Sequence, residues 1–248
     1  MYRFSLLFVL FLFVSQNAHA ANWGKCSADT KTIVDQADRI MFSKSSAGKM
    51  TMVVKKTGYS SSMTMKFWSE GRDKMLVKIT APARNKNTST LKVVNNVWYY
   101  MPRTDRIVKV NSSMMGESWM GSHFTNDDLV RETQLYKHYT CDSRTDTAGE
   151  VIVTLKPKPD APVVWGKIIM KIRKKDNIPI ESGYYSEKGV LKRTMQFSNI
   201  KTVDGRTVPT VMTLKPAGSA EYTQLTYEKI RFDVAIPSSY FSLRGLKK

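Results

Sequence analysis

Residues 49–80, KMTMVVKKTGYSSSMTMKFWSEGRDKMLVKIT, decide the fold. Apolar residues alternate with polar ones through three runs, KMTMVVKK, SSMTMKFW and KMLVKIT. Because successive side chains of a strand point to opposite faces, this alternation indicates strands with one buried face. Turn-forming residues around Gly58 and Gly71 separate the runs, so the stretch predicts antiparallel hairpins.

Similar runs extend in both directions from this stretch. One amphipathic helix is predicted from Asp29 to Phe42, and a short helix after Thr125 with Asp127 and Asp128 in its first turn. The further strand-like runs are TLKVV, VWYYM, RIVKV, EVIVTLKP, VVWGKIIMKIRKK, IPIESGYYSE, VLKRTMQFSNI, RTVPTVMTLKP and AEYTQLTYEKIRFDV. About a dozen strands with two intervening helices predict a mainly β domain, an open barrel or a strongly bent sheet.

The composition bounds the class of protein. Of 248 residues, 42% are hydrophobic and 10% aromatic, which excludes disorder as the main state. The 13 glycines and 9 prolines exclude a collagen-like chain, and two cysteines exclude a disulfide framework or a four-cysteine zinc site.

The first twenty residues resemble a secretory signal. Arg3 precedes an apolar run, and Ala18-His19-Ala20 matches the small-x-small cleavage pattern. We expect cleavage after Ala20 and one domain over residues 21–248 in the periplasm; an uncleaved anchor is the less favoured alternative. In this oxidising compartment, Cys26 and Cys141 are interpreted as a disulfide between the N-terminal arm and the strand after the second helix.

The net charge of +18 has two interpretations. Lysine and arginine alternate with apolar residues instead of forming a basic arm, and an exported chain seldom meets nucleic acid, so we expect no nucleic-acid partner. The favoured interpretation is a solvated cationic outer face. The alternative is steering towards an anionic membrane surface or an acidic protein.

One predicted strand face is rich in methionine. Methionine is flexible and polarizable, so such a face suits either a plain core or the adaptable lining of a lipid-binding cavity. The predicted cavity lining consists of Met50, Met52, Met63, Met65, Phe67, Met75, Val77, Met170, Met195 and Phe197. Residues 111–122 show neither the two-residue period of a strand nor the period of a helix, so they are interpreted as a long loop. This loop resembles a lid, and its apolar residues are Met114, Met115, Trp119 and Met120.

Catalytic and metal-binding patterns are scarce. His123 with Asp127 and Asp128 is a weak metal hypothesis, because acids in the first turn of a helix are explained by its dipole. The sequence contains no G-x-S-x-G elbow, P-loop or G-x-G-x-x-G. We therefore expect a non-enzymatic protein without cofactor, and an enzyme acting on lipid or glycan is a distant alternative.

Several blocks resemble one known family. These are WSEGR at 68–72, WYYMPR at 98–103, the pair Met114-Met115, and SWMGS at 118–122 followed by FTNDDL at 124–129. Their order is similar to that of the LolA-like family of outer-membrane lipoprotein-sorting proteins, and the resemblance covers nearly the whole chain after residue 20. It implies a LolA/LolB-like incomplete antiparallel barrel of about eleven strands, with helices covering a cavity for acyl chains.

The resemblance also implies a function and partners. The expected function is periplasmic transport of lipid or lipoprotein acyl chains between membranes, with transient membrane contact. The WYYMPR and SWMGS blocks are absent from the shorter lipoprotein carrier and indicate a branch that accompanies resistance-nodulation-division (RND) exporters. The carrier's lid-holding arginine cannot be matched to one position here; Arg72 and Arg103 are candidates by neighbourhood alone, so its role is not transferred to either. The alternative is a periplasmic lipid sensor of the RseB type, a family that has a second C-terminal domain.

Overall fold

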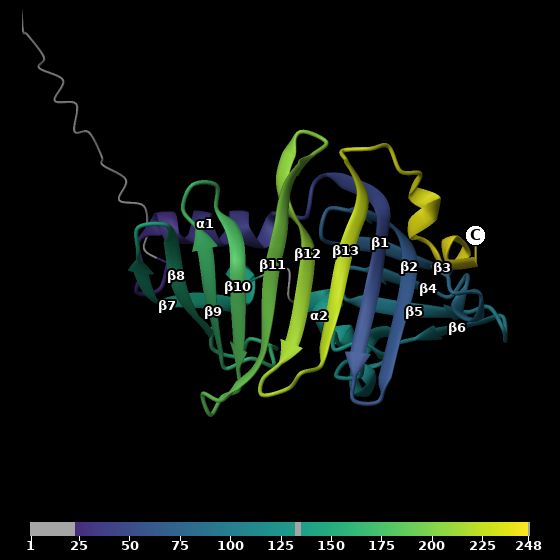
Figure 1. Ribbon diagram of the computed structural model, residues 1–248, viewed down its shortest axis with the longest axis horizontal. Coiled ribbons are helices and arrows are strands. Elements are labelled where there is room, and N and C mark those ends of the chain that lie inside the picture. Colours follow the sequence, from purple (N-terminus) through teal and green to yellow (C-terminus); the bar gives the residue numbers. More distant parts are fainter. Residues whose placement is uncertain (1–22, 132–134, 248) are drawn as a thin grey trace, which may run out of the picture.

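The computed structural model describes residues 23–131 and 135–247. Within them, thirteen strands form one antiparallel sheet (Figure 1), in the order β6-β5-β4-β3-β2-β1-β13-β12-β11-β10-β9-β8-β7. The prediction of an open, mainly β architecture is confirmed, with thirteen strands instead of about eleven. The predicted signal peptide, residues 1–20, lies outside the described residues.

The strands have the following bounds: β1 Ser45–Lys56, β2 Tyr59–Glu70, β3 Lys74–Ala81, β4 Ser89–Val93, β5 Asn96–Met101, β6 Arg106–Lys109, β7 Tyr139–Asp146, β8 Glu150–Pro157, β9 Lys167–Arg173, β10 Ile178–Tyr185, β11 Leu191–Val203, β12 Arg206–Pro216 and β13 Tyr222–Phe232. The helices are α1 Ala28–Arg39, α2 Asn126–Arg131, α3 Leu135–His138 and α4 Leu243–Lys247. Short 3-10 helices are η1 Ala83–Asn85, η2 Ser112–Met114, η3 Trp119–Gly121 and η4 Ser238–Phe241.

The sheet is a meander that is opened at one point. Each strand pairs with the next strand along the chain, except that β6 does not pair with β7, and β1 also pairs with β13, which joins the two ends of the meander. The opening lies between β6 and β7, which are the two edge strands. The connection between these edges carries η2, η3, α2 and α3, so the least periodic part of the sequence lies where the sheet is not closed.

The predicted alternation in the first hairpin is confirmed. Met50 pairs with Met65, and Met52 pairs with Met63, so all four side chains share one face. These methionines are buried, and so are Val77 and Ile79 on the next strand. We call this the inner face, because it packs against the helices and contains the main core.

Gly48 allows an aromatic contact across β1. A Cβ at this position would lie 2.1 Å from the Lys229 carbonyl oxygen and 2.8 Å from the ring of Phe67. The Phe67 ring instead lies edge-on to Tyr227, with ring centroids 5.5 Å apart. A glycine is therefore required where the backbone of β1 passes between its neighbours.

Helices cover both faces of the sheet, but at different places. On the inner face α1 buries Val34 and Ala37, in agreement with the amphipathic helix predicted from Asp29. On the outer face of β3 and β4, Leu76 and Leu91 pack against Phe241 and Leu246 of the C-terminal segment. This C-terminal cover was not expected from the sequence.

A disulfide attaches the N-terminal arm to an edge of the sheet. Cys26 and Cys141 are bonded, with their Cα atoms 5.7 Å apart, and the Lys25 N–H donates to the Cys141 carbonyl at 2.9 Å. The arm therefore covers the backbone of β7. Among the described helices, each is too short or too polar to cross a bilayer.

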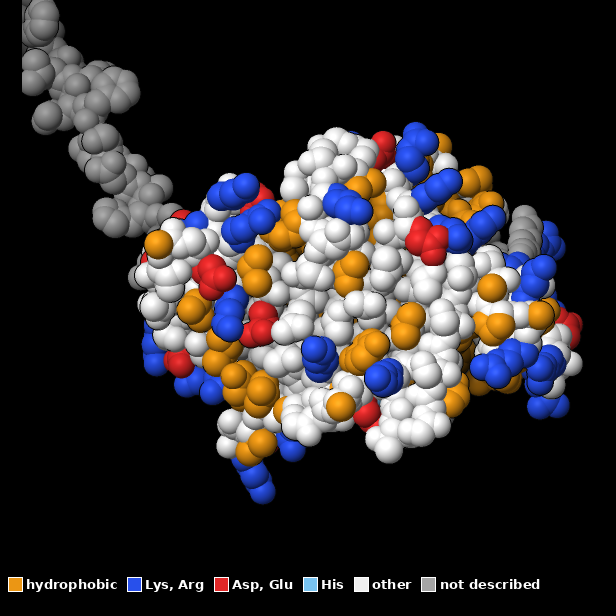
Figure 2. Space-filling view, in the orientation of Figure 1, with side chains coloured by type: hydrophobic (Ala, Val, Ile, Leu, Met, Phe, Trp, Pro, Cys, Tyr) orange, Lys and Arg blue, Asp and Glu red, His pale blue; other side chains and the backbone are white. Residues whose placement is uncertain are grey.

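The outer face is polar and carries dispersed charges. Figure 2 shows lysine and arginine side chains dispersed over this face, among hydrophobic side chains, other side chains and backbone. Some of them form ion pairs on the sheet, such as Lys171 with Glu181 at 2.9 Å and Lys49 with Glu228 at 2.5 Å. The outer face thus resembles a solvated cationic surface.

Candidate functional site

The inner face forms part of the walls of two neighbouring, partly open cavities that are mainly apolar. The first, of about 160 Å³, lies beside the end of α1, and we call it the α1 cavity. Its lining is Ala37, Asp38, Ile40, Met41, Phe42, Phe124, Leu135, Met170, Pro179, Ser182, Tyr184, Met195, Phe197, Met212 and Tyr227. Three methionines from three different strands give this cavity walls that can adapt to an apolar ligand.

The second cavity, of about 150 Å³, lies against α2, and we call it the α2 cavity. Its lining is Phe42, Met50, Ser69, Arg72, Lys74, Met75, Val77, Lys92, Trp119, Phe124, Asp128, Leu129, Leu225 and Tyr227. The walls are again mainly apolar, but three cationic side chains also line this cavity.

Three aromatic residues line both cavities and separate them. They are Phe42 after α1, Phe124 before α2, and Tyr227 on β13, and we call them the aromatic partition. Burial raises the pKa of Tyr227 to about 12, so its phenol stays neutral at physiological pH.

The predicted lining residues do not all reach a cavity. Met170, Met195 and Phe197 line the α1 cavity, and Met50, Met75 and Val77 line the α2 cavity. Met52 and Met65 are fully buried in the packed core, and Phe67 packs against Tyr227. Met63 lines a different, polar pocket of about 290 Å³ beside Arg84 and Arg103.

The four apolar residues of the predicted lid lie apart. Trp119 is buried against the α2 cavity, and its indole N–H donates to Thr90 Oγ1 at 3.1 Å. Met120 lines the polar pocket of Met63, whereas Met114 packs beside α2 and Met115 lines a separate pocket at the opening of the sheet. Backbone hydrogen bonds also hold the loop in place. Because Trp119 is buried and bonded to Thr90, it fixes this segment to the sheet.

A buried ion pair attaches α2 to the sheet. Arg193 Nη1 and Nη2 each donate to one Asp128 oxygen at 2.7 Å, a bidentate arrangement with both side chains less than a tenth exposed. The guanidinium lies 4.5 Å from the centroid of the Trp165 ring and 4.8 Å from that of Tyr184. Such planar, stacked recognition is specific to arginine.

Asp128 also caps α2. Its carboxylate accepts the Thr125 N–H at 2.7 Å, and its own N–H donates to Thr125 Oγ1 at 3.2 Å. This reciprocal capping box fixes the start of the helix. His123, in contrast, lies against Thr223 and Glu221, at 2.8 Å and 3.3 Å. The described residues contain no group of three potential metal ligands, and Asp128 and His123 have these other partners.

A second buried pair joins α1 to the turn between β2 and β3. Arg72 Nη1 donates to Asp38 Oδ2 at 2.8 Å, and the same oxygen accepts the Leu135 N–H at 3.3 Å. Burial raises the pKa of Asp38 to about 6, and the charge of Arg72 partly offsets this effect. Asp38 thus connects α1, α3 and the sheet next to the α1 cavity.

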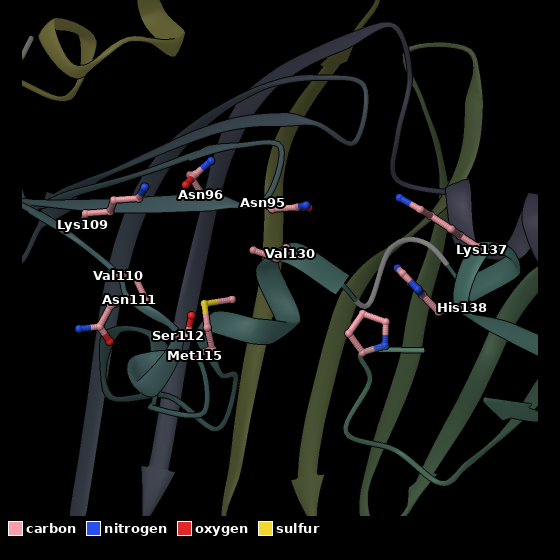
Figure 3. Close-up of a pocket in the computed structure, with 11 residues that line it drawn as sticks. Asn95, Asn96, Lys109, Val110, Asn111, Ser112, Met115, Val130, Lys137 and His138 are labelled. Carbon is pink, nitrogen blue, oxygen red and sulfur yellow. The ribbon is translucent and has the colours of Figure 1, made fainter. Parts of the chain in front are cut away.

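The opening of the sheet holds a fourth pocket, which is polar and has a volume of about 490 Å³. Figure 3 shows Asn95, Asn96 and Lys109 on one side of it and Lys137 and His138 on the other. Its lining is mostly polar, so it is less suited to hydrocarbon than the two cavities of the inner face.

Sequence reasoning missed the buried charges. Arg193 occurs in LKRTMQF in phase with Met195 and Phe197, so its inward position was detectable from the alternation. Asp128 was interpreted as a helix-dipole residue, and Arg72 as a turn residue. Lys92 had no clear signal, because β4 is buried on both faces.

Comparisons with known proteins agree with this architecture. The chain aligns over 91% of its length with all of a DUF1329 family protein from Desulfovibrio piger, at 20% identity and a TM-score of 0.79. A putative outer membrane lipoprotein-sorting protein domain from Vibrio parahaemolyticus gives 22% identity and 0.74, with 88% and 98% coverage of the two chains. A LolA superfamily protein from Nitrosomonas europaea gives 19% and 0.69, with 86% and 96% coverage.

Sequence comparisons add a family without an assigned role. No curated protein matches the chain. A family model described as an uncharacterized protein matches residues 71–248, which is most of the chain. The protein therefore belongs to this uncharacterized family, and its fold is the open antiparallel sheet of the LolA-like structures.

Proposed function

We propose that the protein is a non-enzymatic carrier that shelters acyl chains of a lipid or lipoprotein between its sheet and its helices. The observation that carries this proposal is the pair of apolar cavities on the inner face, of about 160 and 150 Å³. An apolar cavity of about 150 Å³ stays dry and binds a benzene-sized ligand. Each cavity is about half of the ~300 Å³ that a small-molecule site usually needs, so an acyl chain requires both.

The physical basis is removal of hydrocarbon from water. Burial of apolar surface contributes about 25 cal/mol per Å², and methionine walls adapt to chains of different shape. Loading would displace the aromatic partition and join the cavities. The segment from Trp119 to α2 would act as the cover, held by the ion pair between Asp128 and Arg193.

The finer parts of the proposal concern place and partners. We place the carrier in the periplasm, where it receives or delivers its cargo at an RND-type exporter and touches membranes transiently. The net charge of +18 and the dispersed outer cations support attraction to anionic surfaces. Cross-linking in cells would test the exporter; capture of a membrane regulator instead of an exporter would support the RseB-type sensor.

The first test is identification of bound lipid. Protein purified without detergent is extracted with organic solvent and analysed by mass spectrometry, and a fluorescent fatty acid is titrated into the stripped protein. We expect a co-purified lipid and saturable binding. No extracted lipid together with no binding of the fatty acid would refute the proposal.

A cavity-filling variant places the binding on the inner face. Ser182 lines the α1 cavity, so Ser182→Leu fills it and should weaken fatty-acid binding by about fivefold or more without loss of thermal stability. Ser198→Leu is the matched control, because Ser198 is exposed on the neighbouring strand β11. Equal affinities of the two variants would show that the ligand binds elsewhere.

A further inference from the structure

Lys92 is a buried ammonium group on the inner face. The residue is 3% exposed, and its neighbours across β3 and β5 are Met75 and Val97. Its Nζ donates to the Arg72 carbonyl oxygen at 2.6 Å. An ammonium has three N–H donors. Within the described part of the chain, Lys92 forms no ion pair with a carboxylate.

A buried ammonium group without a paired carboxylate destabilises the folded protein. Lysine is almost never fully buried without a partner, because loss of water disfavours its charge. Burial lowers the pKa of Lys92 to about 8; Asp73 acts in the opposite direction, and Arg72 in the same direction as burial. At neutral pH the side chain therefore still carries most of its charge inside the protein.

Lys92 lines the α2 cavity together with two other cations. Arg72 and Lys74 are the others, and we call these three residues the cationic end. Arg72 is paired with Asp38, and Lys74 with Glu70 at 2.8 Å. The remaining acid of the lining, Asp128, is paired with Arg193. Lys92 is thus the cation of this cavity whose charge is not matched by a paired carboxylate among the described residues.

The rest of the cavity wall is hydrocarbon. Met75 and Val77 continue from Lys92 along the neighbouring strand, and Trp119, Phe124 and Leu225 close the other sides. A site with one cationic end and apolar walls matches an amphiphile with an anionic head. A free inorganic anion would leave the apolar walls without a partner, and a neutral lipid would leave the charge of Lys92 without a counter-ion.

We propose that the α2 cavity binds the anionic head group of a single-chain amphiphile at Lys92, with Arg72 beside it, and the first part of its chain along Met75 and Val77. This inference rests on the proposed carrier function and specifies its cargo. The head is a carboxylate or a phosphate monoester, because both present anionic oxygens to an ammonium. The cavity volume of about 150 Å³ admits one chain, which continues across the aromatic partition.

The test compares head groups on one chain length. Dodecanoate, dodecyl phosphate and dodecanol are titrated calorimetrically into the delipidated full chain, below the critical micelle concentrations of the two anions and below the aqueous solubility of dodecanol. We expect each anion to bind about tenfold or more tightly than dodecanol. Lys92→Met should remove this preference and leave dodecanol binding unchanged, while Lys66→Met, an exposed lysine on β2, should keep it.

Two further readouts separate binding from a structural role. Removal of an unpaired buried charge should raise the melting temperature of Lys92→Met, whereas a purely structural lysine would lower it. The affinity of the native protein for dodecyl phosphate should fall between pH 7.5 and 9.5, as Lys92 loses its proton, and that of Lys92→Met should not.

The outcomes distinguish this inference from the carrier proposal. If none of the three ligands binds the native protein, both fail. If all three bind with equal affinity, the carrier proposal stands and the anionic site is refuted. This comparison uses the native protein alone and needs no variant. If the anions are preferred but Lys92→Met keeps the preference, the site assigned to Lys92 is wrong. The stronger of the two anions identifies the head group.

Discussion

The α1 cavity and the α2 cavity are similar in size but differ in charge. Both have methionine walls from the inner face, and both share the aromatic partition. The α1 cavity has one charged residue, Asp38, whereas the α2 cavity has Asp128 and the cationic end. Strand alternation explains the apolar walls that the two cavities share. Asp38, Asp128 and Arg72 come from helices and a turn, whereas Lys74 and Lys92 lie on β3 and β4. One cavity is therefore suited to hydrocarbon alone, and the other to a chain with a polar head.

The largest expected effect comes from breaking the ion pair that closes the α2 cavity. Arg193→Ala leaves the Asp128 carboxylate buried without its partner, which should lower the free energy of unfolding by about 3–5 kcal/mol. Urea denaturation measures this change. Arg231→Ala is the control, because Arg231 lies 3.5 Å from Asp204 and is largely exposed, so its loss should cost about 1 kcal/mol or less.

Similar losses for both arginine variants would show that the pair does not hold α2. The double variant Arg193→Met with Asp128→Leu sharpens the comparison. It removes both charges, so it should recover much of the stability lost in Arg193→Ala. It should also release bound lipid faster than the native protein, because α2 then lacks its directional contact with β11.

Removal of one ring of the aromatic partition should join the two cavities into one. Phe124→Ala deletes a ring that lines both, at a cost of about 3 kcal/mol in the free energy of unfolding. We expect affinity for long-chain fatty acids to rise relative to that for short-chain ones, since the joined cavity accepts a longer tail. An unchanged chain-length profile would mean that the partition already opens freely.

The smallest expected effect is a pH dependence from the acid of the α1 cavity. The native pKa of Asp38 is about 6, above its ordinary value of 3.8, so between these values the native state binds more protons than the unfolded state. The free energy of unfolding should therefore fall as pH rises from 4 to 6, by up to about 3 kcal/mol, and this contribution should be level above pH 6.

Asp38→Asn removes this titrating group, so its stability should lack that slope in denaturation measured at pH 4, 5, 6 and 7. Asp160→Asn, at an exposed position, should retain the slope of the native protein. An identical slope in native protein and Asp38→Asn would assign the pH dependence to other carboxylates.

Local patterns predicted the strands well, because the alternation of apolar and polar residues is repeated several times within each strand. KMTMVVKK and SSMTMKFW have the alternation of a half-buried hairpin, and the register of β1 and β2 brings Met50 opposite Met65. The inward position of Arg193 follows the same period, although it was not recognised. Lys92 lies on β4, which is buried on both faces, so the alternation does not indicate to which face its side chain points.

The sequence by itself determined the β-rich class, the hairpin meander and the methionine-rich face, because a two-residue period can be recognised from residues that are close together in the chain. It did not determine which strands would become edges, how the C-terminal segment would cover Leu76 and Leu91, or which charges would meet in the interior. Arg193 and Asp128 are 65 residues apart in the chain. Only the tertiary packing of α2 against the open sheet places them in contact, since the local pattern can indicate that Arg193 points inward but not which residue it meets.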